Sequence, residues 1–152
     1  MNEVRAQVTV AVGPEAAFEA FTADVDRWWR RGERYGGTDV LGHRFDPGVG
    51  GRFVQILADR EAPLGDILVW EPPNRLAFSW RQKNWLPDEI TRVEVTFTPV
   101  ADGTEVVLRH HGFAQVASDV GCDVGYAAGW NELVGWFAES LGAAALEREV
   151  NA

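Results

Sequence analysis

The residue best suited to acid–base or ligand chemistry is His110, which lies near the end of an alternating segment over residues 104–111. Val106, Leu108 and His110 are two positions apart, so in a strand they share one apolar face. A histidine on such a face can orient a ligand, or act as an acid or base whose pKa is tuned by burial. The alternative, which we favour, is a structural histidine whose ring is bonded by a backbone carbonyl or by the region of Trp130.

No other pattern in the chain predicts a nucleophile, a metal site or a phosphate loop. The serines lie outside any G-x-S-x-G sequence, and Cys122 has no histidine at a recognisable spacing. The three histidines lack the spacing of zinc ligands. Gly50 and Gly51 are not followed by the Lys and Ser or Thr of a phosphate loop. We therefore predict no catalytic residue, no metal and no cofactor.

A basic segment interrupted by two tryptophans is the one concentration of positive charge. It predicts a surface for an acidic partner, or a lid over a cavity with one tryptophan inside. The alternative that we favour is a short helix with one buried tryptophan and solvated arginines. The partner-binding candidates are Arg27, Arg30, Arg31 and Arg34, on either side of Trp28 and Trp29.

The composition limits the class of protein. The 152 residues fit one domain, of which 46% are hydrophobic and 24% charged. A net charge of −9 argues against a binder of nucleic acids or anionic membranes. The single cysteine suits a reducing compartment, and there is neither a signal-peptide pattern nor an apolar run of membrane-spanning length. We expect a cytoplasmic protein.

Hydrophobic periodicity predicts the elements that position these residues. Apolar residues alternate in the expected strands and recur every three or four positions in the expected helices. We expect helices over 14–23, 26–31 and 126–149, and strands over 4–12, 52–58, 65–71, 75–81, 91–99 and 104–111. Strands joined by short turns are antiparallel, so the chain is predicted to be α+β, with about six strands packed on the long C-terminal helix. The glycine-rich residues 32–51 are a loop or a bulged strand.

Seven tryptophans and eight phenylalanines are the compositional excess. Many fall on predicted inner faces, with His110 as the main ionisable group there. These residues are our candidates for lining a ligand cavity: Trp29, Phe53, Trp80, Phe97, His110, Trp130 and Phe137. Trp85 is expected to be partly exposed, and Trp136 to lie at the edge of the buried face of the last helix or at an interface. In 65–71 two apolar sets, Ile67 with Val69 and Leu68 with Trp70, are both compatible with the inner face.

Three stretches resemble a known family. GDILVWEPPNRLAFSW (residues 65–80), GTEVVLRHHGF (residues 103–113) and Gly129-Trp130 are similar to motifs of the activators of heat-shock-protein-90 ATPase and their bacterial single-domain relatives. That family lies within the START-like, or Bet v 1-like, superfamily. The resemblance covers the whole chain, and it implies a single START-like domain over residues 1–152 with the helix-grip fold, a curved sheet around the C-terminal helix.

The resemblance implies three possible functions, since one superfamily hosts many activities. The leading one is a non-catalytic domain that binds a small hydrophobic ligand between sheet and helix. The second is a chaperone-associated module that stimulates a heat-shock-protein-90 ATPase through an outer surface such as Arg27 to Arg34. The third is a cyclase or dehydratase that uses His110 with a cavity-facing carboxylate. The chain is expected to be a monomer or a homodimer.

Overall fold

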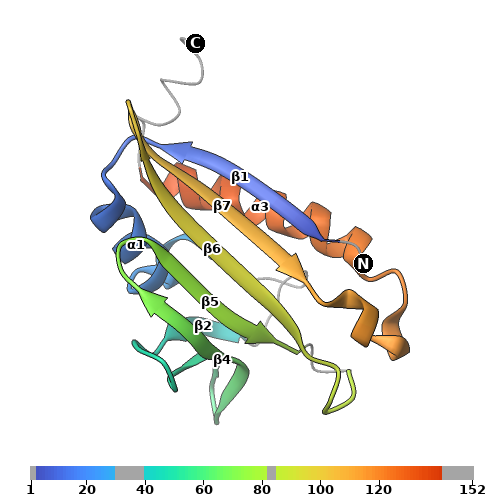
Figure 1. Cartoon of the computed structure of the whole chain (residues 1–152). Coiled ribbons are helices and arrows are strands. Elements are labelled where there is room, and N and C mark those ends of the chain that lie inside the picture. Colours follow the sequence, from blue (N-terminus) through green and yellow to red (C-terminus); the bar gives the residue numbers. More distant parts are fainter. Residues whose placement is uncertain (1–2, 30–39, 82–84, 142–152) are drawn as a thin grey trace.

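The computed structural model of the chain describes residues 3–29, 40–81 and 85–141, and it has the expected α+β architecture (Figure 1). Helices and strands follow in the order β1 (Val4–Val10), α1 (Pro14–Thr22), α2 (Val25–Trp28), β2 (Val40–Phe45), β3 (Arg52–Leu57), β4 (Glu61–Glu71), β5 (Arg75–Trp80), β6 (Thr91–Val100), β7 (Gly103–His111), the 3-10 turns η2 (Phe113–Gln115) and η3 (Ala117–Asp119), and α3 (Asp123–Ser140).

One antiparallel sheet holds all the described strands in the order β1-β7-β6-β5-β4-β3-β2. The sheet curls so that α3 lies against β1 and β7 on its concave side, while α1 and α2 cover the remainder (Figure 1). This is the helix-grip arrangement, and the fold class and the two short helices after the first strand are confirmed.

The described sheet has seven strands, where the sequence predicted about six. The extra strand is β2, within the glycine-rich stretch that the sequence left as a loop or bulged strand. Gly42 interrupts the apolar pattern of this strand because the carboxylate of Asp26 occupies the place of a side chain, 2.8 Å from where a Cβ would lie. His43 then donates its backbone N–H to that carboxylate (3.1 Å), which fastens β2 to α2.

A bulge in β4 explains why alternation could not assign its inner face. The pairing with β5 shifts between Ile67 and Val69, so Ile67 is buried while Leu68 is 40% exposed. After the shift Trp70 faces inward again and meets Phe18 of α1 edge-on, with 5.2 Å between ring centroids. Both apolar sets therefore contribute to the core.

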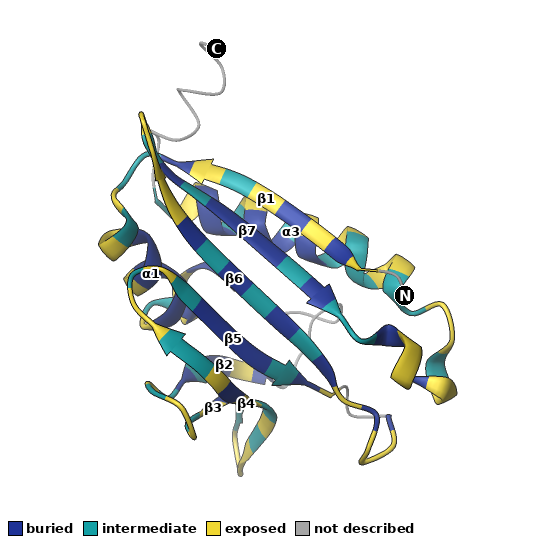
Figure 2. Cartoon of the chain, in the orientation of Figure 1, coloured by how far each residue is buried: buried dark blue, intermediate teal, exposed yellow. Residues whose placement is uncertain are grey.

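The hairpin between β6 and β7 has Asp102-Gly103 at its turn, a pair of residues typical of tight hairpins. Gly103 has φ +150°, and a Cβ there would overlap the carbonyl of Val10, so the turn needs glycine. Buried and partly exposed residues alternate as expected from Thr91 to Phe97 of β6 and along β7, except that Val107 on the outer face of β7 is also buried (Figure 2).

The C-terminal helix α3 starts at Asp123, three residues before the predicted start, and it is described up to Leu141. The predicted extension to residue 149 lies outside the described residues. Its buried face consists of Trp130, Leu133, Val134, Phe137 and Ala138, and Trp136 is half-buried at the edge, as expected. Among the described helices, none has both the length and the apolar character needed to cross a membrane.

Candidate functional site

All seven residues predicted to line a cavity are buried, and five of them come together. Trp29 lies at the C-terminal end of α2, and its ring contacts Phe53 of β3, Trp80 of β5 and Trp130 of α3. The corresponding centroid distances are 5.2, 6.4 and 5.7 Å. His110 of β7 joins them at 6.2 Å from Trp80 and 6.0 Å from Trp130. We call Trp29, Phe53, Trp80, His110 and Trp130 the inner aromatic cluster.

Phe97 and Phe137 lie in a second group of rings, beneath α1. Phe21 is at its centre, 5.8 Å from Phe97 and 5.2 Å from Phe137. Trp28 packs on Phe137 at 5.4 Å and on Trp29 at 5.6 Å, so it joins the two groups. The predicted lining residues thus divide between two ends of one continuous core.

The ring of His110 is hydrogen-bonded on both nitrogens. Trp130 donates its indole N–H to Nδ1 (2.9 Å), and Nε2 lies 2.7 Å from the hydroxyl oxygen of Thr91. The Thr91 hydroxyl donates its own proton to the carbonyl of Trp80 (3.1 Å). Because an indole can only donate, Nδ1 is the acceptor, and this network assigns the proton of the neutral ring to Nε2.

Burial, with a smaller contribution from the charge of His111, lowers the pKa of His110 to about 3. The ring is therefore neutral at ordinary pH, and its only lone pair is used by Trp130. This is the arrangement expected of a structural histidine bonded in the region of Trp130. It leaves no ring nitrogen available to take a proton from a substrate.

Two side chains that the sequence analysis did not select complete the surroundings of the cluster. His43 of β2 is buried and lies 5.0 Å from Trp29, in the glycine-rich stretch for which a loop and a bulged strand were the two alternatives. Tyr126 of α3 accepts a hydrogen bond from the indole N–H of Trp80 (2.8 Å) and lies 4.9 Å from His110. Burial raises the pKa of Tyr126 above its usual value, so its hydroxyl stays protonated.

Trp85 is buried beside Tyr126, so the prediction that it is partly exposed is wrong. Its side chain is 3% exposed, packs at 6.0 Å from Tyr126 and donates its indole N–H to Asp119 (3.0 Å). Asp119 and Tyr126 are distant in sequence, so the polar turn around Trp85 gave no sign of them.

The carboxylate of Glu89 links the turn that contains Trp85 to the segment around η3. This carboxylate accepts the backbone N–H groups of Leu86 (2.8 Å) and Ser118 (2.9 Å) and the hydroxyl of Ser118. These donors lower the pKa of Glu89 below its usual value. The residues near Trp85 and those around η3 are thereby held together beside the inner aromatic cluster.

The tryptophans of the basic segment correct a second prediction, because both are buried and not only one. Trp28 is 2% and Trp29 4% exposed, and Trp28 donates its indole N–H to the carbonyl of Ala20 (3.1 Å). Arg27 is solvated, with 80% of its side chain exposed. Arg30, Arg31 and Arg34 lie outside the described residues.

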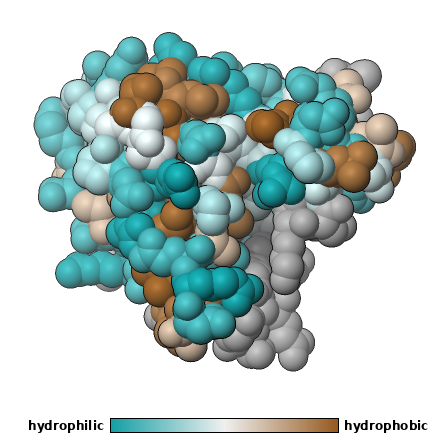
Figure 3. All heavy atoms as spheres, turned by 90° about the horizontal axis from the view of Figure 1, so that it is seen from below, coloured by the Kyte–Doolittle hydropathy of each residue, from teal (hydrophilic) through white to brown (hydrophobic). Residues whose placement is uncertain are grey.

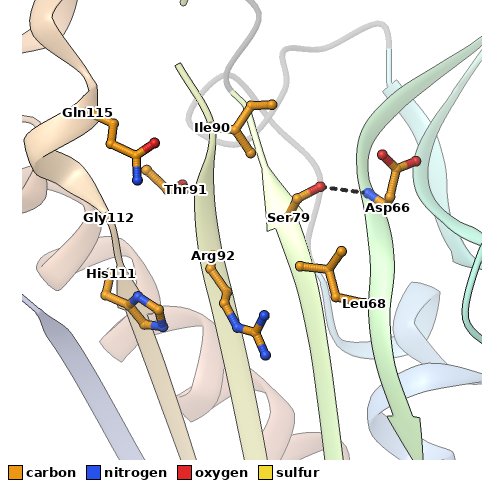
Figure 4. A pocket seen from close by; sticks show the side chains of 9 residues that line it. All are labelled: Asp66, Leu68, Ser79, Ile90, Thr91, Arg92, His111, Gly112 and Gln115. Atoms are coloured by element: carbon orange, nitrogen blue, oxygen red, sulfur yellow. Dashed lines mark hydrogen bonds between the residues drawn. The ribbon is translucent and has the colours of Figure 1, made fainter. Parts of the chain in front are cut away.

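A recess of about 470 Å³, lined by both polar and apolar side chains, lies on the outer face of the sheet (Figure 4). Ser79, Arg92 and His111 are paired across β5, β6 and β7 and alternate with buried residues, so they face away from α3. Ser79 also accepts the backbone N–H of Asp66 (2.9 Å). Arg92 is within 3.6 Å of Glu94, an ion pair typical of a solvated sheet surface.

The described residues offer no metal site. No group of three or more His, Cys, Asp and Glu residues among them could hold a metal ion. Seen from below, apolar side chains gather in separate groups between hydrophilic ones (Figure 3). The thiol of Cys122 is half-buried, and burial raises its pKa, which disfavours the reactive thiolate.

A curved sheet closed on a C-terminal helix, with aromatic side chains between them, defines the START-like class. Within it, the sequence profile described as "Activator of Hsp90 ATPase homolog 1-like protein" matches residues 11–142, so the chain belongs to this family. A comparison with curated protein sequences found no match.

Solved structures agree on the fold. Protein MLL2253 from Mesorhizobium loti superposes with a TM-score of 0.70 at 21% identity, over 92% of this chain and 96% of that one. The Aha1 dimer from Colwellia psychrerythraea gives 0.66 at 15% identity, over 94% and 98%. The anthrahydroquino-γ-pyrone synthase Txn09, solved in complex with SUM, gives 0.62 at 32% identity, over 92% and 97%.

Proposed function

We propose that the chain binds a small, mainly apolar ligand between the sheet and α3 and does not act on it chemically. The observation that carries the proposal is the inner aromatic cluster, in which rings from α2, β3, β5, β7 and α3 converge. Pockets for small molecules are lined by apolar and aromatic side chains with a few placed polar groups. Txn09, a relative at 32% identity solved with SUM bound, supports the same assignment.

We assign the ligand contacts to Trp29, Phe53, Trp80 and Trp130, with His110 as the polar residue of the wall. Phe97 and Phe137 support these rings from the second group. The lack of catalysis follows from His110, whose nitrogens are both engaged and whose pKa is lowered to about 3. A ring in that state holds Trp130 in place and does not transfer protons near neutral pH.

Removing the Trp80 ring is expected to lower the affinity for an apolar ring compound at least tenfold, because a buried indole contributes a large contact area. Indane is a suitable probe, and its binding is followed by tryptophan fluorescence or calorimetry with wild type and Trp80→Ala. Trp70→Ala is the matched control, since Trp70 packs on Phe18, outside the cluster, and its affinity is expected to stay within about twofold. Solvent extraction and mass spectrometry of the purified protein would identify a co-purified ligand. Absence of both a co-purified ligand and indane binding would contradict the proposal.

A synthase activity is the second candidate, and the identity of 32% to Txn09 favours it. Such an activity requires an acid or base that contacts the ligand, and both ring nitrogens of His110 are already hydrogen-bonded within the protein. The test is incubation of the chain with the substrate of Txn09, followed by mass spectrometry of the products. Turnover that persists in His110→Ala would assign the chemistry to another residue, and turnover lost only in that variant would restore His110 as the acid–base group.

A chaperone-associated role is the third candidate, and the family's description favours it. The exposed Arg27 is the described residue of the basic segment that is available to an acidic partner. Stimulation of a bacterial heat-shock-protein-90 ATPase by the wild-type chain, reduced in Arg27→Glu, would support this role. An unchanged ATPase rate would remove it.

A further inference from the structure

The indole N–H groups of the buried tryptophans share a pattern with one exception. Five described tryptophans are less than a tenth exposed: Trp28, Trp29, Trp80, Trp85 and Trp130. Four of them donate to acceptors within 3.1 Å, which are the Ala20 carbonyl, the Tyr126 hydroxyl, the Asp119 carboxylate and His110 Nδ1. Trp29 is only 4% exposed, and its buried Nε1 has no hydrogen-bond partner among the residues that the structure describes.

A buried donor without an acceptor loses its hydrogen bonds to water and forms none within the protein. Such groups are rare and call for an explanation. In this chain the exception falls on the residue at the centre of the inner aromatic cluster. The four satisfied indoles show that the fold supplies acceptors to its buried tryptophans elsewhere. The missing acceptor of Trp29 Nε1 therefore indicates which kind of group binds beside this ring.

The surroundings of Trp29 define the chemistry of the missing acceptor. Phe53 has no polar atom, and the N–H groups of Trp80 and Trp130 are already engaged. The described ring contacts of Trp29 include no Lys or Arg to balance a negative charge, and the imidazole of His43, 5.0 Å away, is the remaining polar ring beside it. An anion would be buried at high cost there, which favours a neutral acceptor. A carbonyl oxygen only accepts, which matches the indole N–H of Trp29, whereas a hydroxyl would bring a further donor.

We infer that Trp29 Nε1 donates a hydrogen bond to the carbonyl oxygen of an uncharged ring compound held in the inner aromatic cluster. The inference rests on the proposed function and narrows its ligand to cyclic ketones and related ring carbonyl compounds. Aromatic faces around Trp29 provide the contact area for the rings, and the indole N–H of Trp29 binds the oxygen.

Two probes of nearly equal shape test the inference, because indanone carries a ring carbonyl and indane does not. Wild type is expected to bind indanone about five to ten times more tightly than indane, the gain typical of one neutral hydrogen bond. Trp29→Phe retains an aromatic ring and removes the N–H, so the preference is expected to vanish. Trp28→Phe is the matched control: its N–H is bonded to Ala20, and the preference is expected to remain.

NMR spectroscopy of the wild-type protein tests the inference without depending on the folding of a variant. In ¹H–¹⁵N spectra the indole resonance of Trp29 is expected to move downfield with indanone and not with indane. Binding of neither probe would overturn both the proposed function and this inference. Equal affinity for the two probes in wild type, or a preference that persists in Trp29→Phe or is lost in Trp28→Phe, would overturn the hydrogen bond alone and leave ligand binding in place.

Discussion

Acidification from about pH 8 to about pH 5 is expected to lower the free energy of unfolding by about 2 kcal/mol through His110 alone, since its pKa falls from the usual 6.5 to about 3 on folding. As the pH falls, the unfolded chain binds a proton at this histidine before the folded chain does. The stabilisation is therefore complete above the usual pKa and declines toward the folded one. Over the whole interval it amounts to about 5 kcal/mol. Urea unfolding at several pH values measures it.

Two histidine variants isolate the contribution of His110. His110→Leu is expected to flatten the slope above about pH 5, although it is less stable at neutral pH because Trp130 and Thr91 lose their shared partner. His111→Gln changes the neighbouring histidine on the outer face and should keep most of the slope, since His111 is the lesser cause of the shift. Carboxylates such as Glu89 contribute at lower pH in all three proteins. A slope that survives in His110→Leu, or a His110 ring that titrates near its usual pKa by NMR, would contradict the assignment.

The inner face of the sheet could be predicted wherever a strand is regular. In β5, β6 and β7 the pairings keep one register, so Phe78, Val95 and Leu108 lie inward as alternation requires. In β4 the bulge after Ile67 moves the chain by one position and returns Trp70 to the inner face. A period of two cannot describe a strand that changes face in this way.

The missed parts of the site depend on partners that are distant in sequence. Trp85 lies in a polar turn, and its burial results from Asp119 and Tyr126, which reach it from η3 and α3. His43 belongs to a strand whose pattern is broken by Gly42, and that glycine is explained by Asp26 of α2. The spacing of residue types along the sequence predicts neither contact. Trp80 and His110 could be predicted because they lie on strands with regular pairing, and Trp130 because it lies on the apolar stripe of a helix. Phe53 lies at a register shift of β3 and Trp29 just after α2, so regular spacing does not explain their place in the cluster.

Truncation of Phe137 is expected to cause the largest loss of stability that remains separable from ligand binding. Phe137 is fully buried and contacts Phe21 and Trp28 at 5.2 and 5.4 Å, so Phe137→Ala leaves a cavity in the second group of rings. Such a change costs about 3–5 kcal/mol, from lost burial and from the cavity itself. Trp136→Ala is the neighbouring control, because Trp136 is half-buried at the helix edge and should cost much less. Urea denaturation of both variants at neutral pH provides the comparison.

The same variant tests how the two groups of rings divide structure from binding. If ligand contacts belong to the inner aromatic cluster, folded Phe137→Ala should bind indane within about threefold of wild type, because the ring contacts of Phe137 are with Phe21 and Trp28, which lie outside the cluster. Trp80→Ala should instead lose more affinity for indane than Phe137→Ala does. A Phe137→Ala protein that is folded by circular dichroism yet no longer binds indane would place Phe137 in the ligand wall. The binding site would then extend beneath α1, and the separation of the two groups would be wrong.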